Sequence, residues 1–297
     1  MKYTNKHNLP QPFVDLVTQD RYDNGGSDFT TTGLLKPPRI VALEKKHWND
    51  LESDVSELVW RMSGQAKHYV LEMMAKKSPD RHIAEQRFFL HLSGVKISGQ
   101  IDLFDKKEKV LYDWKETSVW KGILGDQIDW TRQGNINRFL LSKSGVEVEA
   151  IKNIAFFKDW KRNEAKNDAS YPQCPIQIFN LDVWPLEQTE KFIRERIAMH
   201  QAAKVTLPEC SPEDRWQKQD AWAVMKQGRK SAVKVHYEKP LAELHLQACD
   251  KRHSIEFRPG KSVRCEAYCP CLKFCAQGQK LVEAGKSEEP EAAQEAF

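Results

Sequence analysis

The sequence has no long apolar run. None of its apolar stretches approaches the roughly 20 residues that a membrane-spanning helix needs. The start of the sequence, residues 1–6, lacks the apolar segment of a secretory signal. These two absences exclude the membrane and secreted classes, so we expect a cytoplasmic protein with no membrane partner.

The sequence also lacks a complete phosphate-binding loop. Gly260-Lys261-Ser262 and Gly285-Lys286-Ser287 resemble the end of such a loop. The glycine that the motif requires five positions earlier is replaced by Ile255 and Lys280. We therefore expect no ATPase activity, and any unwinding of nucleic acid would need a partner such as a helicase or a recombination protein.

The composition is that of a globular chain with little charge imbalance. The 297 residues are 40% hydrophobic, which suffices for one full core with an accessory segment. A net charge of +4 is too small to require a nucleic-acid partner. Local cation clusters suit a strand of nucleic acid, although a solvated surface explains each of them equally well. These clusters are 158–162, Arg132, Arg138, Arg229 and Lys230.

Two acids and a lysine are spaced so that they can meet on neighbouring strands. Asp113 and Lys115 stand two positions apart, so in a strand they share one face. Asp102 lies on the preceding strand, before a turn at 105–108. Carboxylates hold a divalent cation that polarises a phosphoryl oxygen, and an ammonium group offsets the developing charge. The trio suits phosphodiester hydrolysis, whereas an exposed hairpin with ordinary charges is the plain alternative.

A helix is predicted upstream of these strands, from Asp54 to Lys77. Its apolar residues recur at helical spacing, and further apolar residues lie on the opposite side, so we expect protein on both sides. Gly64, His68 and Glu72 form a separate row along the helix. A lone helical histidine is usually a surface residue, so His68 becomes a candidate ligand only in the company of the acids.

The remaining pattern predicts a mixed α/β core. Strands are expected at 85–92, 95–104, 110–115, 154–157 and 176–183, and helices at about 126–141 and 186–203. We divide the chain into an irregular N-terminal arm (1–40), a core (41–204), a cysteine-rich segment (205–284) and a disordered acidic tail (285–297).

The residues singled out above follow the order of a known nuclease family. The series Gly64-x3-His68, Glu85, Gly99-Gln100-Ile101-Asp102, Asp113-Trp114-Lys115 and Gln133 resembles the RecB-type branch of the PD-(D/E)XK nucleases. That branch includes the nuclease domains of RecB and AddB, CRISPR-associated RecB-like exonucleases and phage-encoded relatives. The phage-encoded members are the most similar, through the pattern Thr32–Arg39 and the tail Arg264–Pro270. The resemblance spans about Thr30 to Cys275 and implies a restriction-endonuclease-like core, a mixed central sheet flanked by helices.

The resemblance implies a role for each matching residue of the strands and the helix. His68, Asp102 and Asp113 match the metal ligands, with the Trp114 carbonyl as a fourth. Lys115 matches the catalytic lysine. The cation would be Mg²⁺ or Mn²⁺, and the imidazole favours manganese because magnesium prefers an all-oxygen shell.

Two further positions match the family, and one departs from it. Glu85 matches an upstream acid that helps to bind metal in some members, and Gln133 matches the glutamine of the helical motif. The family usually has tyrosine four residues after that glutamine, where this chain has Asn137. The asparagine at this position puts the motif's DNA contact or helix packing in question more than its metal chemistry.

The cysteines are concentrated near the C-terminus. Four thiolates can hold zinc or an iron–sulfur cluster, and the paired Cys-x2-Cys knuckles of a zinc ribbon are absent. The closing Cys-x5-Cys resembles the tail of AddB and the CRISPR-associated exonucleases, where a 4Fe-4S cluster fixes the C-terminal segment. In those relatives the first cysteine precedes the nuclease motifs, whereas here it follows them. We expect Cys210, Cys265, Cys269 and Cys275 to hold a 4Fe-4S cluster, with zinc as the alternative, Cys271 as a spare, and Cys174 and Cys249 as isolated thiols.

The expected function is that of a metal-dependent deoxyribonuclease, more an exonuclease than an endonuclease. Its DNA would be single-stranded or end-exposed, in phage or bacterial recombination, replication or repair. If the chain is phage-encoded, it would act in the cytoplasm of the bacterial host. Two alternatives stay open: a catalytically weak or inactive DNA-binding or recombination scaffold that retains the fold, and a structural phage component.

Overall fold

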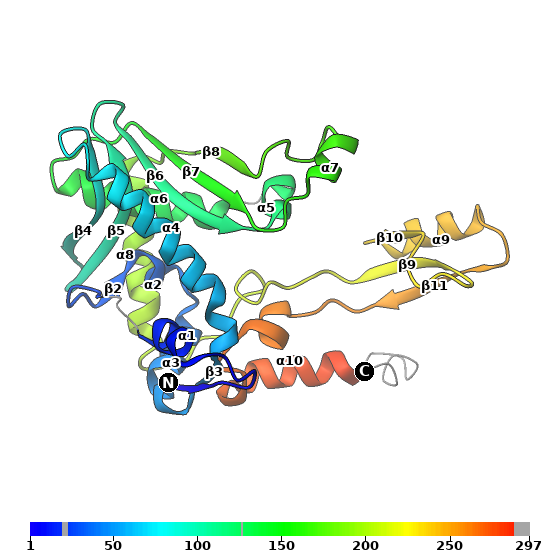
Figure 1. Ribbon diagram of the computed structural model, residues 1–297. Coiled ribbons are helices and arrows are strands. Elements are labelled where there is room, and N and C mark those ends of the chain that lie inside the picture. The colour runs from blue at the N-terminus through cyan, green and yellow to red at the C-terminus, as the bar shows by residue number, and fades with distance from the viewer. Residues whose placement is uncertain (20–22, 126, 288–297) are drawn as a thin grey trace. The chain divides into compact units, whose positions relative to one another are not determined.

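The computed structural model describes residues 1–19, 23–125 and 127–287 (Figure 1). The chain forms two compact units. The core unit comprises Lys2–Lys36 and Glu52–Val205. The cysteine unit comprises Met1, Pro37–Leu51 and the segment from Thr206 onward. Pro37–Leu51 therefore belongs with the C-terminal part of the chain, although the predicted division at residue 41 assigns most of it to the core.

A six-stranded mixed sheet forms the centre of the core unit. Strands β2-β5-β6-β7-β8 follow one another in this order, and β4 pairs with β5. β4, β5 and β6 form an antiparallel meander, β7 runs parallel to β6, and β8 is antiparallel to β7. The strands are β2 (Phe29–Thr30), β4 (His82–Leu92), β5 (Val95–Asp105), β6 (Val110–Thr117), β7 (Ala150–Phe157) and β8 (Ile176–Leu181).

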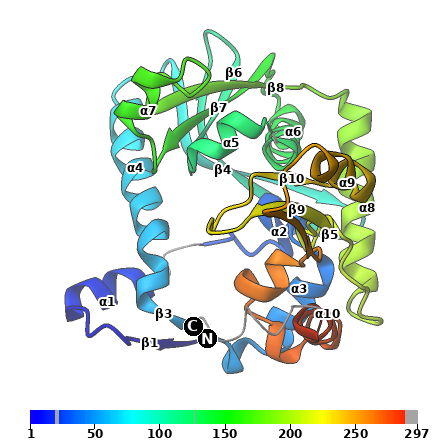
Figure 2. The ribbon, with the colours of Figure 1, turned by 90° about the vertical axis from the view of Figure 1, so that its right-hand side faces the viewer.

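Helices cover both faces of this sheet. α4 (Val59–Ala75) packs against β4, β5 and β6, and α6 (Ile128–Lys143) packs against β4 to β8. Figure 2 shows α4 on one side of the sheet, and α6 with α8 (Leu186–Ala202) on the other. The expected α/β architecture, a mixed sheet flanked by helices, is confirmed at this level.

Most predicted elements of the core unit are observed within a few residues. The turn between β5 and β6 forms because the Asp105 carboxylate accepts N–H groups from Lys107 at 2.9 Å and Glu108 at 3.0 Å. The other elements of this unit are β1 (Lys2–Thr4), α1 (Gln11–Thr18), α2 (Thr31–Leu35), β3 (Glu52–Asp54), η2 (Val55–Leu58), α5 (Val119–Leu124) and α7 (Arg162–Asn167).

The prediction of an irregular arm at residues 1–40 is wrong. This stretch contains helices α1 and α2, and strand β2 joins the central sheet beside β5. Leu34 of α2 is fully buried in the main apolar core. The composition misleads because prolines here begin helices rather than interrupt them: Pro12 stands in the first turn of α1, and Pro38 in that of α3 (Pro38–Lys46).

The prediction that α4 has protein on both sides is also wrong. Trp60, Tyr69 and Val70 of this helix are 57%, 63% and 58% exposed. α4 packs against the sheet, and residues of both apolar rows stay exposed: Trp60 of the second row, and Tyr69 and Val70 of the main row.

The cysteine unit contains a small antiparallel sheet with strand order β10-β9-β11, and α9 packs on all three strands (Figure 1). Ile40 and Leu43 of α3 share an apolar cluster with Cys271 and Cys275. The elements are α3 (Pro38–Lys46), η1 (Trp48–Asp50), β9 (Ala221–Lys226), β10 (Lys234–His236), α9 (Lys239–Gln247), β11 (His253–Arg258), the helical turns Arg264–Tyr268 and Leu272–Phe274, and α10 (Ala276–Ser287).

The end of the chain departs in part from its predicted disorder. Helix α10 continues to Ser287, which includes the first residues of the predicted acidic tail. The rest of that tail, residues 288–297, lies outside the described residues. Across the parts of the chain that the structure describes, no helix has the length and apolar character needed to span a membrane.

Candidate functional site

The candidate site lies where β5 and β6 diverge in the sheet of the core unit. Strand β6 pairs with β5 at three residues, Leu103–Asp105, and β2 pairs at Ile97–Ser98. β4 occupies the other edge of β5, so the stretch between these two ladders is open toward β6. Because the strands separate here, side chains from helices on opposite faces of the sheet can meet in this gap.

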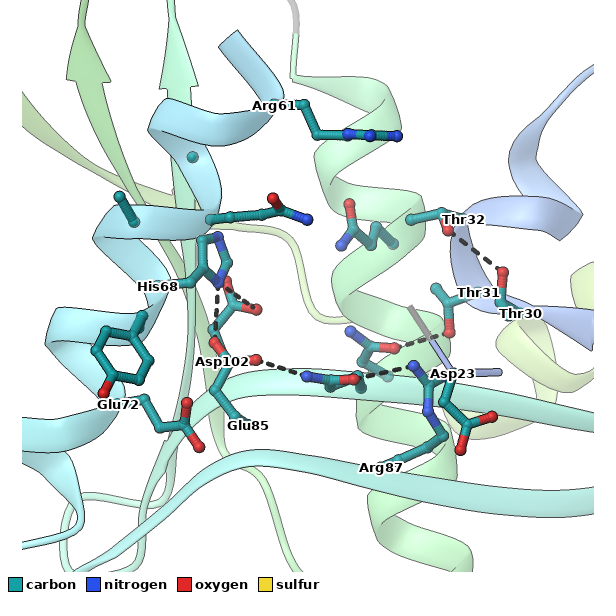
Figure 3. Close-up of a pocket in the computed structure, with 18 of the residues that line it drawn as sticks. Asp23, Thr30, Thr31, Thr32, Arg61, His68, Glu72, Glu85, Arg87 and Asp102 are labelled. Carbon is teal, nitrogen blue, oxygen red and sulfur yellow. Dashed lines mark hydrogen bonds and ion pairs between the residues drawn. The ribbon is translucent and has the colours of Figure 1, made fainter. Parts of the chain in front are cut away.

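His68, Glu85 and Asp102 meet at this gap (Figure 3). Their ligand atoms all lie within 4.8 Å of one another. His68 Nδ1 is 2.9 Å from Glu85 Oε1 and 3.6 Å from Asp102 Oδ1. Two carboxylates and an imidazole at this spacing fit one divalent cation. The structure thus gives Glu85 a place equal to that of His68 and Asp102.

Glu85 reaches this position from a left-handed backbone conformation. Its φ angle is 49°, which a non-glycine residue adopts at a cost of about 1 kcal/mol. The β4–β5 pairing is regular on both sides of Glu85 and Asp102 but is interrupted at these two residues. The interruption directs both carboxylates toward His68.

Asp113, Lys115 and Gln133 form the second half of the site. Lys115 Nζ lies 2.6 Å from Asp113 Oδ2 and donates to Gln133 Oε1 at 2.8 Å. Gln133 Nε2 donates to Asp113 Oδ1 at 2.9 Å. The predicted common face of Asp113 and Lys115 is therefore observed, and α6 supplies the glutamine that orients both.

The two halves are joined through the backbone of β6. The Trp114 N–H, between Asp113 and Lys115, donates to Asp102 Oδ2 at 2.6 Å. This amide is the part of Trp114 that contacts Asp102, and the ligand role of the Trp114 carbonyl stays a prediction. Asp113 Oδ2 is buried and forms the ion pair with Lys115 Nζ at 2.6 Å, although the pair lacks the geometry of a regular hydrogen bond. A carboxylate offers about four acceptor sites on its two oxygens, so Asp113 has the capacity to contact Lys115, Gln133 and a cation together.

The charges of the site shift the pKa values of two of its residues. Burial and the nearby charge of Asp113 raise the pKa of Asp102 to about 8. The hydrogen bond with Glu85 raises the pKa of His68. Crowded carboxylates thus hold protons that a bound divalent cation would replace, which couples cation binding to proton release.

Several residues that support the site have no role in the sequence prediction. Gln100 Nε2 donates to Glu85 Oε2 at 2.7 Å, and Arg87 donates to Gln100 Oε1 at 2.9 Å. Lys67 of α4 pairs with Glu116 of β6. The period of two along β5 places Gln100 on the same side as Asp102. This pattern in the sequence is sufficient to predict Gln100 as a residue of the site.

A groove of about 1060 Å³ leads to this site. His68, Glu85, Asp102 and Gln133 line it, whereas Asp113 lies buried behind Gln133. Trp60 and Tyr69 of α4 add aromatic rings to the wall. An open groove beside a cluster of acids and an ammonium group can admit a long polar substrate.

Asn137, at the position where the nuclease family that the sequence resembles usually has tyrosine, packs against its neighbours. It is 3% exposed, and Thr31 Oγ1 donates to its Oδ1 at 2.8 Å. A Cβ atom on Gly99 would lie 2.3 Å from the same oxygen. The short amide therefore fits between α2 and β5, where a larger side chain would need both to move.

The cysteine unit brings four predicted thiols together. Arg39 of α3 donates from Nε to Cys275 Sγ at 3.1 Å and from Nη1 to the Pro208 carbonyl at 3.0 Å. Cys271 is buried beside the Ile40 carbonyl, while Cys174 is exposed in the core unit and Cys249 is half-buried. One small cavity is lined by Cys210, Cys265, Cys269 and Cys275.

The spacing of these thiols bears on what they can hold. A single zinc ion binds four thiolates at about 2.3 Å, which places the sulfur atoms less than 4 Å or so from one another. Among the described residues, no three cysteine sulfurs lie within 4.8 Å of one another. Burial raises the pKa of Cys210, and a hydrogen bond from Cys271 lowers that of Cys269 to about 6. Zinc and a 4Fe-4S cluster both stay predictions for this cavity.

Comparison with known proteins adds little to these observations. No known protein family matches the sequence, and no curated protein matches it. Among solved structures, the chain is similar to one titled "Crystal structure of SSO0001", with 16% identity. The match covers 69% of this chain and 86% of that chain, with a TM-score of 0.44. A likeness of this degree carries no conclusion about fold family or function.

Proposed function

We propose that this protein is a metal-dependent deoxyribonuclease with a restriction-endonuclease-like core. The observation that carries the proposal is the convergence of His68, Glu85 and Asp102 next to the Asp113–Lys115 pair. An imidazole and two carboxylates in the groove wall, with a third carboxylate and an ammonium group next to Gln133 of that wall, are groups that suit phosphodiester hydrolysis.

The donor set supports Mn²⁺ or Mg²⁺ as the cation. Carboxylate oxygens suit both ions, and the imidazole nitrogen favours manganese. His68, Glu85, Asp102 and Asp113 would hold it. When bound, the cation supplies Lewis acidity toward a phosphoryl oxygen and toward water.

Other residues of the site would have separate roles in the reaction. Lys115 offers an ammonium group beside the acids, where it can neutralise charge that develops on the phosphate. Gln133 holds Lys115 and Asp113 at 2.8 and 2.9 Å, which fixes the direction of both. The groove wall with Trp60 and Tyr69 suits unpaired bases, because aromatic rings stack on bases of any sequence. We therefore favour exonuclease action on single-stranded or end-exposed DNA, in recombination, replication or repair.

The proposal extends to the cysteine unit and to partners. Cys210, Cys265, Cys269 and Cys275 would hold a 4Fe-4S cluster, with zinc as the alternative. The cluster would stabilise the fold and take no part in hydrolysis. A helicase or a recombination protein in the cytoplasm would supply unwound DNA.

The proposal is tested by incubating the protein with end-labelled single-stranded and double-stranded DNA. We expect products with Mg²⁺ or Mn²⁺ and none without a divalent cation. DNA binding without products at any cation would favour the scaffold alternative, and neither binding nor products would favour a structural phage component.

A further inference from the structure

One end of the small sheet in the cysteine unit gathers exposed cations. The turn after β9 is closed by the Arg229 N–H, which donates to the Lys226 carbonyl at 3.0 Å. The Gln227 N–H donates to the Arg252 carbonyl at 2.8 Å, which ties this turn to the segment before β11. Arg229, Lys230, Lys251 and Arg252 are all exposed there. We call these four residues the basic end.

The basic end carries charge that its surroundings do not neutralise. Between Lys218 and Lys261 the sequence holds ten Lys and Arg residues but only five Asp and Glu residues. This excess exceeds the net charge of +4 of the whole chain. Asp250 pairs with Arg252 at 2.8 Å, whereas Arg229 and Lys230 form no ion pair within the described parts of the chain.

The chemistry of the basic end selects its partner. Exposed lysine and arginine side chains that lack acidic partners attract a polyanion, and phosphates bind them with release of counterions. Residues 226–231 and 250–252 contain no aromatic ring, so the stacking platform of single-strand binders is missing. We propose that the basic end binds the phosphate backbone of duplex DNA.

This inference rests on the proposed function in one respect, since it takes DNA as the ligand. It concerns residues of the cysteine unit, whereas all candidate ligands of the catalytic cation belong to the core unit. Duplex held at the basic end would keep a DNA molecule associated with the protein between cleavage events.

The test is fluorescence anisotropy with a labelled duplex and its single strand. All variants carry Asp113→Asn to prevent cleavage, and no divalent cation is added. For Arg229→Gln/Lys230→Gln, we expect the dissociation constant for duplex to rise about tenfold or more at 0.1 M salt. The slope of log K against log salt should fall by roughly 1.8, since each lost phosphate contact removes about 0.9.

Two controls make the result specific. Lys45→Gln/Lys46→Gln removes the same charge from exposed positions of α3 in the same unit and should leave duplex affinity within about twofold of its original value. Arg229→Lys/Lys230→Arg keeps the charge and should retain binding.

Three results would each overturn the inference. The first is an equal loss of duplex affinity in Arg229→Gln/Lys230→Gln and in Lys45→Gln/Lys46→Gln. The others are unchanged duplex affinity in Arg229→Gln/Lys230→Gln, and a loss of affinity confined to single strands. Failure of the nuclease proposal is distinguishable, because it would show as absent cleavage by the original sequence while duplex binding at the basic end persists.

Discussion

Replacing Asp113 with asparagine is expected to reduce DNA cleavage by at least about 10²–10³-fold, the range for loss of one preorganised electrostatic group. The substitution keeps the shape of the side chain. It removes the charge of a buried carboxylate that contacts Lys115 at 2.6 Å and that we propose as a cation ligand. Initial rates on end-labelled DNA with Mn²⁺ measure the effect.

The same variant should still bind DNA, since Asp113 is buried behind the groove wall. Asp129→Asn is the matched control: this acid lies in the first turn of α6, on the helix that carries Gln133, and its side chain is 69% exposed. Its cleavage rate should stay within about twofold, as expected for an exposed position. Cleavage by Asp113→Asn at the original rate would contradict the proposed role.

Replacing Cys265 with serine is expected to remove the bound metal from the cysteine unit. The four thiols line one cavity, and the loop between Cys210 and Cys265 has little apolar core of its own near the thiols. Metal binding and folding are then coupled, so the unfolding temperature of this unit should fall by about 10 °C or more. Metal analysis, visible absorbance and thermal unfolding measure the change.

Cys174→Ser is the control, because Cys174 is exposed and belongs to the core unit. It should keep both the metal content and the unfolding temperature. A visible absorbance band in the original protein, lost in Cys265→Ser, indicates iron and sulfide, whereas a colourless protein with one zinc supports the alternative. Unchanged metal content in Cys265→Ser would refute the assignment of this thiol.

The sequence is informative about the site where the residues are close along the chain. The period of two places Asp113 and Lys115 together, and the turn at Asp105 brings Asp102 opposite them. Local periodicity therefore suffices for the strands and the acids. Periodicity also places His68 in a row apart from the main apolar face of α4. It does not reveal that this apolar face is partly exposed.

Other features depend on contacts between distant residues and leave no local signal. Thr31 meets Asn137 across 106 positions, and Arg39 meets Cys275 across 236. The N-terminal region packs through such contacts. Its composition points to an irregular arm because composition carries no information about contacts with distant residues. The left-handed conformation of Glu85 is equally invisible in the sequence, since tertiary packing imposes it.

The central claim is that His68 and the neighbouring carboxylates form one cation site. Pulsed electron paramagnetic resonance of the Mn²⁺-loaded protein tests it most directly, because the spectrum detects nitrogen bound to manganese. We predict a ¹⁴N coupling from one imidazole that disappears in His68→Gln and persists in His91→Gln, a histidine exposed on β4. A manganese spectrum without nitrogen coupling, or a coupling that survives His68→Gln, would contradict the account.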